Sequence, residues 1–199
     1  MSINRMRRLA IVVEVQSLLL LWPTRALAHP MKGVGDFYAG MLHPMTAIEC
    51  ILPMVALSPL AGQQNRKTAI GILISFPLAS VVGALLGLSI PVPHSVAIIN
   101  TAAMALLGIL VAINPTLPFQ VSVGLSAILG LTIGWANAGE LTTGASPYRF
   151  IPGLALAGLL VVTHGIGLVR RLDVPWARVG VRVAGSWIAA VGILVLSLK

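Results

Sequence analysis

Charged residues are scarce in this 199-residue chain, and their scarcity excludes most classes of soluble protein. Only 9% of the residues are charged, against roughly 25% in a soluble domain, and the mean hydropathy is +0.97. Cysteine occurs once, at Cys50, so no disulfide can form within the chain. Neither a phosphate-binding G-x-x-x-x-G-K-[ST] motif nor an H-E-x-x-H motif occurs, so we expect no nucleotide-driven pump and no enzyme.

Aromatic residues are also few, and this bears on the positive charge of the chain. The formal net charge is +8, yet only 5% of the residues are aromatic and the basic residues do not alternate with them. A nucleic-acid interface would need a clustered basic face. The basic residues lie instead between apolar runs, which is typical of a protein that sets its orientation in a membrane.

The first 28 residues have the three parts of an export signal. Arg5, Arg7 and Arg8 precede an apolar stretch from residue 9 to 21, and an A-x-A cleavage site ends at Ala28. Cleavage there would make His29 the first residue of the mature protein. Glu14 within the apolar stretch leaves open the alternative that this segment stays attached as a transmembrane helix.

Six further apolar runs are separated by turn-forming or charged stretches. A span needs about 20 apolar residues to cross a bilayer core of about 30 Å. We therefore predict an all-α membrane protein with a single domain, residues 29–199, folded as a six-helix transmembrane bundle. The predicted spans are 36–61, 68–90, 95–113, 118–140, 150–169 and 179–198. Glycines spaced four apart, at 83 and 87 and at 130 and 134, predict close helix packing.

The basic residues predict which way the bundle faces. The connections 62–67 and 170–178 hold five of them, and Arg182 follows just inside the last span. Segments on the other side hold only Lys32, Arg149 and Lys199. Because basic loops stay in the cytoplasm, we expect a bacterial inner-membrane protein whose mature N-terminus lies on the outer side.

Side chains that can bind metals are concentrated in residues 29–54, which hold two His, two acids, one Cys and four Met. An unpaired acid such as Glu49 is costly in a bilayer, so it should face the bundle interior. His43 and Cys50 are two turns apart, about 10 Å on a straight helix, which is too far to share an ion. Pro44 and Pro53 permit a kink that could bring His43 and Glu49 to a common point.

Two patterns in this segment resemble the signature of the HupE/UreJ family of nickel and cobalt permeases. They are His29-Pro30 and Phe37-x-x-Gly40-x-x-His43-Pro44, and the family signature continues P-x-x-G-x-D-H. In this chain Ala47 replaces the glycine, Glu49 the aspartate and Cys50 the second histidine. The resemblance implies an exported signal, six spans and metal uptake.

The resemblance continues, with departures, in two later spans. A family stretch of the form H-G-Y-A-H-G-x-E corresponds to residues 133–140, where Asn137 replaces the second histidine and Glu140 is retained. His164 matches a family position in the fifth span, although a hydrogen bond between helices is an alternative role. We predict metal ligands at His43, Glu49, Cys50, His29 and His164, and a pathway lined by Asp36, Asn137 and Glu140. A small buried apolar role remains open for Cys50.

These residues predict a secondary permease that carries a divalent metal, with no permanently bound cofactor. Nickel or cobalt is expected first; copper is the alternative, because thiol and thioether ligands favour Cu(I). The expected partners are the metal ion and the lipid bilayer. A partner in a membrane complex, or a second copy of the chain, is a further candidate. A second hypothesis for the function is a non-transporting membrane subunit or accessory protein of a larger complex, built on the same scaffold with a partly lost metal site.

Overall fold

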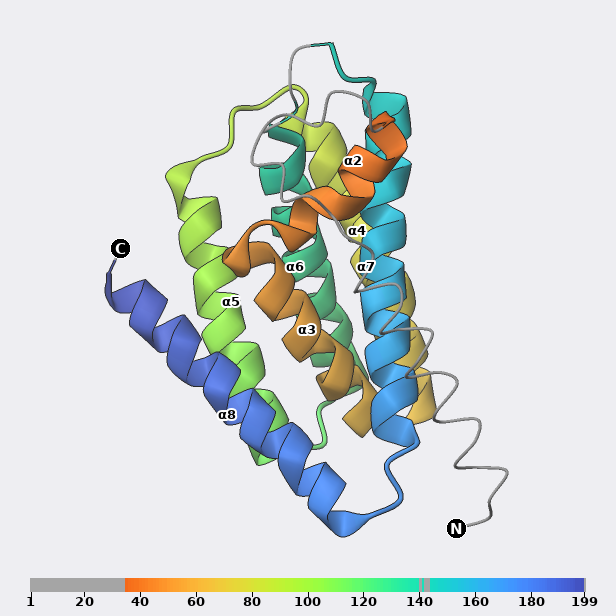
Figure 1. The fold of residues 1–199 in the computed structure, drawn as a ribbon, viewed down its shortest axis with the longest axis vertical. Helices are drawn as coiled ribbons and strands as arrows, with labels where there is room; N and C mark the ends of the chain where they lie inside the picture. Colours follow the sequence, from red (N-terminus) through yellow and green to blue (C-terminus); the bar gives the residue numbers. More distant parts are fainter. Residues whose placement is uncertain (1–34, 140, 142–143, 199) are drawn as a thin grey trace. The chain divides into compact units, whose positions relative to one another are not determined.

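The computed structural model describes residues 35–139, 141 and 144–198, and within these ranges the regular structure is entirely helical (Figure 1). The predicted signal and His29 lie outside the described residues, as does Glu140. The helices are α2 (Asp36–Leu42), the 3₁₀ turn η1 (His43–Met45), α3 (Ile48–Gln63), α4 (Arg66–Gly87), α5 (His94–Ile113), α6 (Phe119–Gly139), α7 (Pro147–Arg170) and α8 (Pro175–Ser197).

Five of these helices, α4 to α8, are each long and apolar enough to cross a membrane. The sixth candidate span is broken: α2 with η1 and α3 pass the same test only together, and their axes differ in direction by 79°. The predicted all-α membrane class is confirmed. α7 and α8 begin three and four residues before their predicted starts, because Pro147 and Pro175 occupy first-turn positions where a missing N–H costs nothing.

The turn between α3 and α4 also holds the turn between α5 and α6. Asn65 caps α4 by accepting a hydrogen bond from the Thr68 N–H at 2.9 Å. Gln64 is buried, donates from Nε2 to the Pro115 carbonyl at 3.1 Å and accepts from the Leu117 N–H at 3.0 Å. These bonds fix the axial position of α3 relative to the end of α5 and the start of α6.

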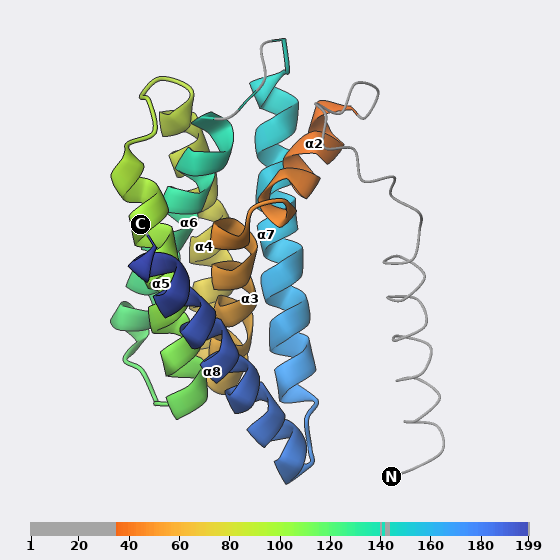
Figure 2. The same cartoon turned by 60° about the vertical axis from the view of Figure 1, so that its left-hand side comes forward.

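Glycines bring α4 and α6 into backbone contact. A Cβ atom placed at Gly83 would overlap the Leu131 carbonyl oxygen, and one at Gly134 would overlap the Ser80 carbonyl oxygen. Gly130 meets the Phe76 carbonyl in the same way. The two helices lie side by side in both views (Figures 1 and 2). The close packing predicted from the glycine spacing is therefore confirmed.

Helix α3 is the centre of the bundle, since it contacts each of the helices α4 to α8 (Figure 2). Eight of its 16 residues are buried, and Leu57 and Leu60 join the main apolar core with Phe76, Leu107 and Val111. Helix α8 packs mainly on α5, where Gly108 and Gly185 allow close approach. The central position of α3 places its first turn among the other helices.

Candidate metal centre

The first candidate span is broken shortly after His43: α-helical structure ends at Leu42, and the bend lies between Met45 and Ile48. Pro44 is buried and cannot donate a hydrogen bond to the Gly40 carbonyl, so α2 ends and one 3₁₀ turn follows. The turn is closed by Thr46, whose N–H and Oγ1 donate to the His43 carbonyl at 3.0 and 2.7 Å. Pro53, by contrast, lies inside a continuous α3. The bend of 79° lies a few residues after Pro44, at Thr46 and the extended Ala47, and Pro53 contributes no second break.

Close contact with α7 fixes the position of His43. A Cβ at Gly40 would overlap the Phe150 carbonyl, and one at Gly153 would overlap the Phe37 carbonyl, so α2 and α7 touch through their backbones. The half-buried His43 ring then meets the Phe150 ring edge to face, with centroids 5.7 Å apart. The spacing Phe37-x-x-Gly40-x-x-His43 therefore acts as a packing device that places an imidazole at the break.

The first turn of α3 carries the next two predicted ligands. Glu49 is half-buried, and Cys50 is buried with 4% of its surface exposed. Asn137 of α6, itself 3% exposed, donates from Nδ2 to the Cys50 Sγ at 3.4 Å and to the Ile133 carbonyl at 2.7 Å. The fold thus brings together two predicted site residues that are 87 positions apart in the chain.

A second buried asparagine, Asn100 of α5, was missed in the sequence analysis. It is 1% exposed, and neither its Oδ1 nor its Nδ2 has a hydrogen-bond partner in the described part of the protein. It lies three turns before Val111 on one face of α5, about 16 Å along the axis. Gln63 binds the Val111 carbonyl at 3.1 Å, so Asn100 lies near the level of the first turns of α3. A polar side chain within the apolar run 95–113 was the available signal.

The other predicted residues lie apart from this group or outside the described ranges. Asp36 accepts a hydrogen bond from the Ser146 N–H at 3.0 Å, which ties the start of α2 to the start of α7. His164 is exposed on α7, with Nδ1 2.7 Å from the Leu160 carbonyl oxygen. Its neighbour Gly165 packs on Ser58, two turns below Cys50 along α3. Within the described ranges, no three His, Cys, Asp or Glu side chains gather as a metal-binding group.

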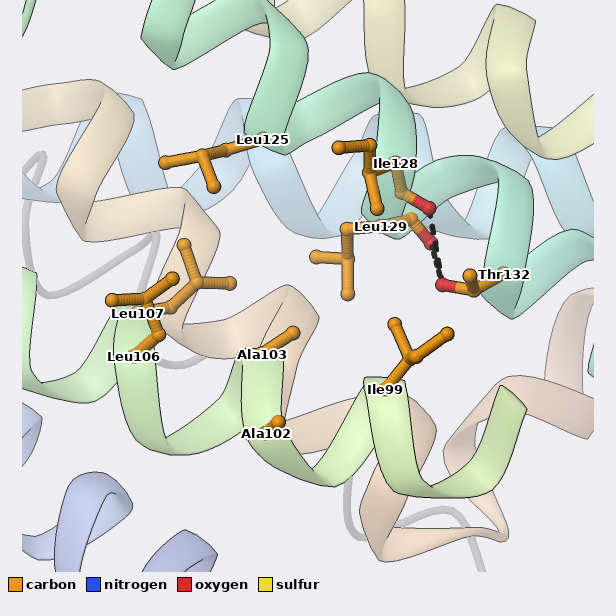
Figure 3. A pocket seen from close by; sticks show the side chains of 9 residues that line it. All are labelled: Ile99, Ala102, Ala103, Leu106, Leu107, Leu125, Ile128, Leu129 and Thr132. Atoms are coloured by element: carbon orange, nitrogen blue, oxygen red, sulfur yellow. Dashed lines mark hydrogen bonds between the residues drawn. The ribbon is translucent and has the colours of Figure 1, made fainter. Parts of the chain in front are cut away.

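A hollow of about 360 Å³ between α5 and α6 offers no alternative site (Figure 3). Its walls are apolar side chains such as Ile99, Leu106 and Ile128, together with Thr132. The Thr132 hydroxyl is used within α6, where it lies 3.1 Å from the carbonyls of Ile128 and Leu129. This hollow therefore supplies no ligand for a cation.

The protein has up to six candidate spans, the first of which is broken, and buried polar side chains lie near the break. These features define a membrane protein that crosses the bilayer several times through α-helices. The chain belongs to the HupE/UreJ family: the family model described as "HupE / UreJ protein" matches residues 17–195. Protein HupE of Rhizobium leguminosarum bv. viciae is 29% identical to it over 180 residues, which cover 89% of this chain and 93% of that relative. No solved structure matches it significantly.

Proposed function

We propose that this protein is a secondary permease for a divalent transition metal, with nickel or cobalt as the first candidates. We place it in the bacterial inner membrane with the mature N-terminus outside. Family membership supports the class, and the break after His43 supports the location of the pathway. Irregular backbone at membrane depth is tolerated where it lines a cavity or an ion path.

The proximity of Cys50 and Asn137 is the observation that carries the site assignment. Both positions are histidines in the family patterns that this chain resembles, and the side chains that replace them are in contact at 3.4 Å. Where the family patterns have two histidines, this chain thus has a thiol and an amide in contact. We infer that the two positions form one unit of the pathway, beside His43 and Glu49, and that this unit sets the preference among metals.

Accumulation of nickel, cobalt, copper and zinc in cells with and without the protein tests the proposal. We expect one of these metals to accumulate more when the protein is present. No change in any metal, together with a stable partner that copurifies, would favour the second candidate, a non-transporting membrane subunit. The observation in favour of that candidate is the loss of three histidines of the family patterns, at positions 50, 133 and 137.

Converting the Cys50 and Asn137 pair to two histidines tests whether they act as one unit. We expect the double variant Cys50→His, Asn137→His to shift uptake toward nickel and cobalt, because imidazole suits these metals. Each single variant should shift the metal preference less than the double variant does, because it places one imidazole beside the original thiol or amide. Competition between metals during uptake measures the shift. Effects of the two single changes that simply add would contradict the shared unit.

Replacing Asn100 by leucine separates a transport role from a structural one. An unpartnered buried amide costs about 1–3 kcal/mol, so Asn100→Leu should leave the thermal stability of the purified protein unchanged or raised. If Asn100 serves passing ions, uptake should nevertheless fall about 10-fold, the effect typical of losing an outer partner at a metal site. Unchanged uptake would remove Asn100 from the pathway.

A further inference from the structure

A second hollow, of about 270 Å³, has a partly polar lining, unlike the apolar hollow between α5 and α6. It lies where α3, α5 and α7 end and α8 begins, away from the break after His43. Three arginines line it: Arg170 at the end of α7, and Arg178 and Arg182 on the first turns of α8. Gln63 and Asn114, from the ends of α3 and α5, complete its polar wall. Among the residues that the structure describes, no acidic side chain lines it.

Each arginine uses a small part of its hydrogen-bonding capacity on a main-chain carbonyl. Arg182 Nε donates to Ala112 at 2.7 Å, Arg178 Nε to Leu172 at 3.1 Å, and Arg170 Nη2 to Gln64 at 3.3 Å. Such bonds are the ordinary way in which arginine satisfies the last carbonyls of a helix. A guanidinium has five N–H donors, however, so these bonds orient the three groups and leave most donors for another acceptor.

The charge around the hollow is one-sided. The segments 62–67 and 170–182 hold six basic residues, Arg66, Lys67, Arg170, Arg171, Arg178 and Arg182, against one acid, Asp173. Asp173 belongs to the connection between α7 and α8 and does not line the hollow. An anion is therefore the ligand that this end of the bundle favours.

The surroundings favour an anion that carries hydrocarbon chains. Exposed apolar side chains occur on both helices that flank the hollow: Leu168 on α7 is 62% exposed, and Val179 and Trp176 on α8 are 55% and 77% exposed. Figure 1 shows α7 and α8 spreading apart above their connection. Tryptophan is typical of the level where lipid head groups begin.

We propose that this hollow binds the head group of an anionic phospholipid, with its phosphate held by Arg178 and Arg182 and assisted by Arg170. Basic pockets between transmembrane helices are suited to such head groups. Phosphatidylglycerol is such a lipid, because its head group carries a net negative charge. A zwitterionic lipid would bring an ammonium group close to three guanidinium groups.

Native mass spectrometry of the purified protein, titrated with phosphatidylglycerol or phosphatidylcholine, tests the proposal. We expect phosphatidylglycerol to bind preferentially and the double variant Arg178→Gln, Arg182→Gln to bind it roughly 30-fold more weakly. The matched control is Arg66→Gln, Arg171→Gln, which removes the same charge from the same end but changes no residue of the hollow. The control should retain most of the binding.

Three outcomes would overturn the proposal. Equal binding of the two lipids would exclude selection by charge, and an equal loss in the control variant would indicate diffuse attraction. Displacement of the lipid by millimolar inorganic phosphate would identify a site for free phosphate. If the double variant does not fold, the single variant Arg178→Gln decides, because among the described residues its hydrogen bond goes to Leu172 of the α7–α8 connection and not to another helix. It should then bind phosphatidylglycerol several-fold more weakly, and unchanged binding would contradict the proposal.

Discussion

Replacing His43 by alanine, or Glu49 by glutamine, is expected to reduce metal accumulation to the level of cells that lack the protein. His43 stands at the break of the first span, where its ring packs on Phe150. Glu49 brings a half-buried carboxylate to the first turn of the central helix, where the helix dipole favours a negative charge. Removing the imidazole or the negative charge should abolish binding of a passing cation without preventing insertion.

Uptake measured alongside the amount of protein in the membrane distinguishes loss of transport from loss of folding. His94→Ala is the matched control for the imidazole, since His94 is exposed at the start of α5. Asp173→Asn is the control for the carboxylate, because Asp173 is exposed in the α7–α8 connection. Full transport by either His43→Ala or Glu49→Gln, at normal membrane levels, would remove that residue from the pathway.

Replacing Gly134 by leucine should greatly reduce the amount of folded protein. Even a Cβ there overlaps the Ser80 carbonyl and crowds the Ala84 nitrogen, and backbone atoms of a packed helix cannot move aside as a flexible side chain can. Overpacking usually costs about 1–3 kcal/mol, and this contact should reach or exceed the upper end. We expect little monodisperse protein after detergent extraction and a lowered melting temperature in what remains.

Gly124→Leu is the control on the same helix. Apart from its chain neighbours and the nearby backbone of its own helix, no heavy atom of the described residues lies within 4 Å of a Cβ built at Gly124, so a leucine there meets no neighbouring helix. Its melting temperature should stay close to that of the unchanged protein. Because leucine has a higher helix propensity than glycine, equal losses at both positions would mean that the effect does not depend on the contact between α4 and α6.

Much of the fold could be predicted from the sequence because bilayer thickness fixes span length and turn-forming residues mark the connections. The predicted span 95–113 became His94–Ile113, and the glycines at 83, 87, 130 and 134 lie at the close contact between α4 and α6. Pro44 signalled the end of α2 because it has no N–H to continue the helix hydrogen bonds, and the bend follows at residues 46 and 47. Pro53 signalled no such end, since the core contacts of α3 continue past it.

The contacts within the candidate site were harder to predict. The periodicity of apolar residues assigns a residue to a face of its own helix. The contact between Cys50 and Asn137, however, depends on the axial register of α3 relative to α6. That register is set by distant groups such as Gln64 and its bonds to residues 115 and 117. Helices that are apolar on nearly all sides also give little sign of which side faces inward, and His164 proved to be exposed.

The bend in the first span also has an electrical consequence. Helix α3 has 16 residues, and at 1.5 Å per residue it is about 24 Å long, shorter than the hydrocarbon layer of about 30 Å. With water reaching the bend from the outer side, the membrane potential would fall mainly along α3. A doubly charged ion that crosses 100 mV gains about 4.6 kcal/mol. For a cation released from the first turn of α3, the resting potential alone would then drive inward movement, without a nucleotide.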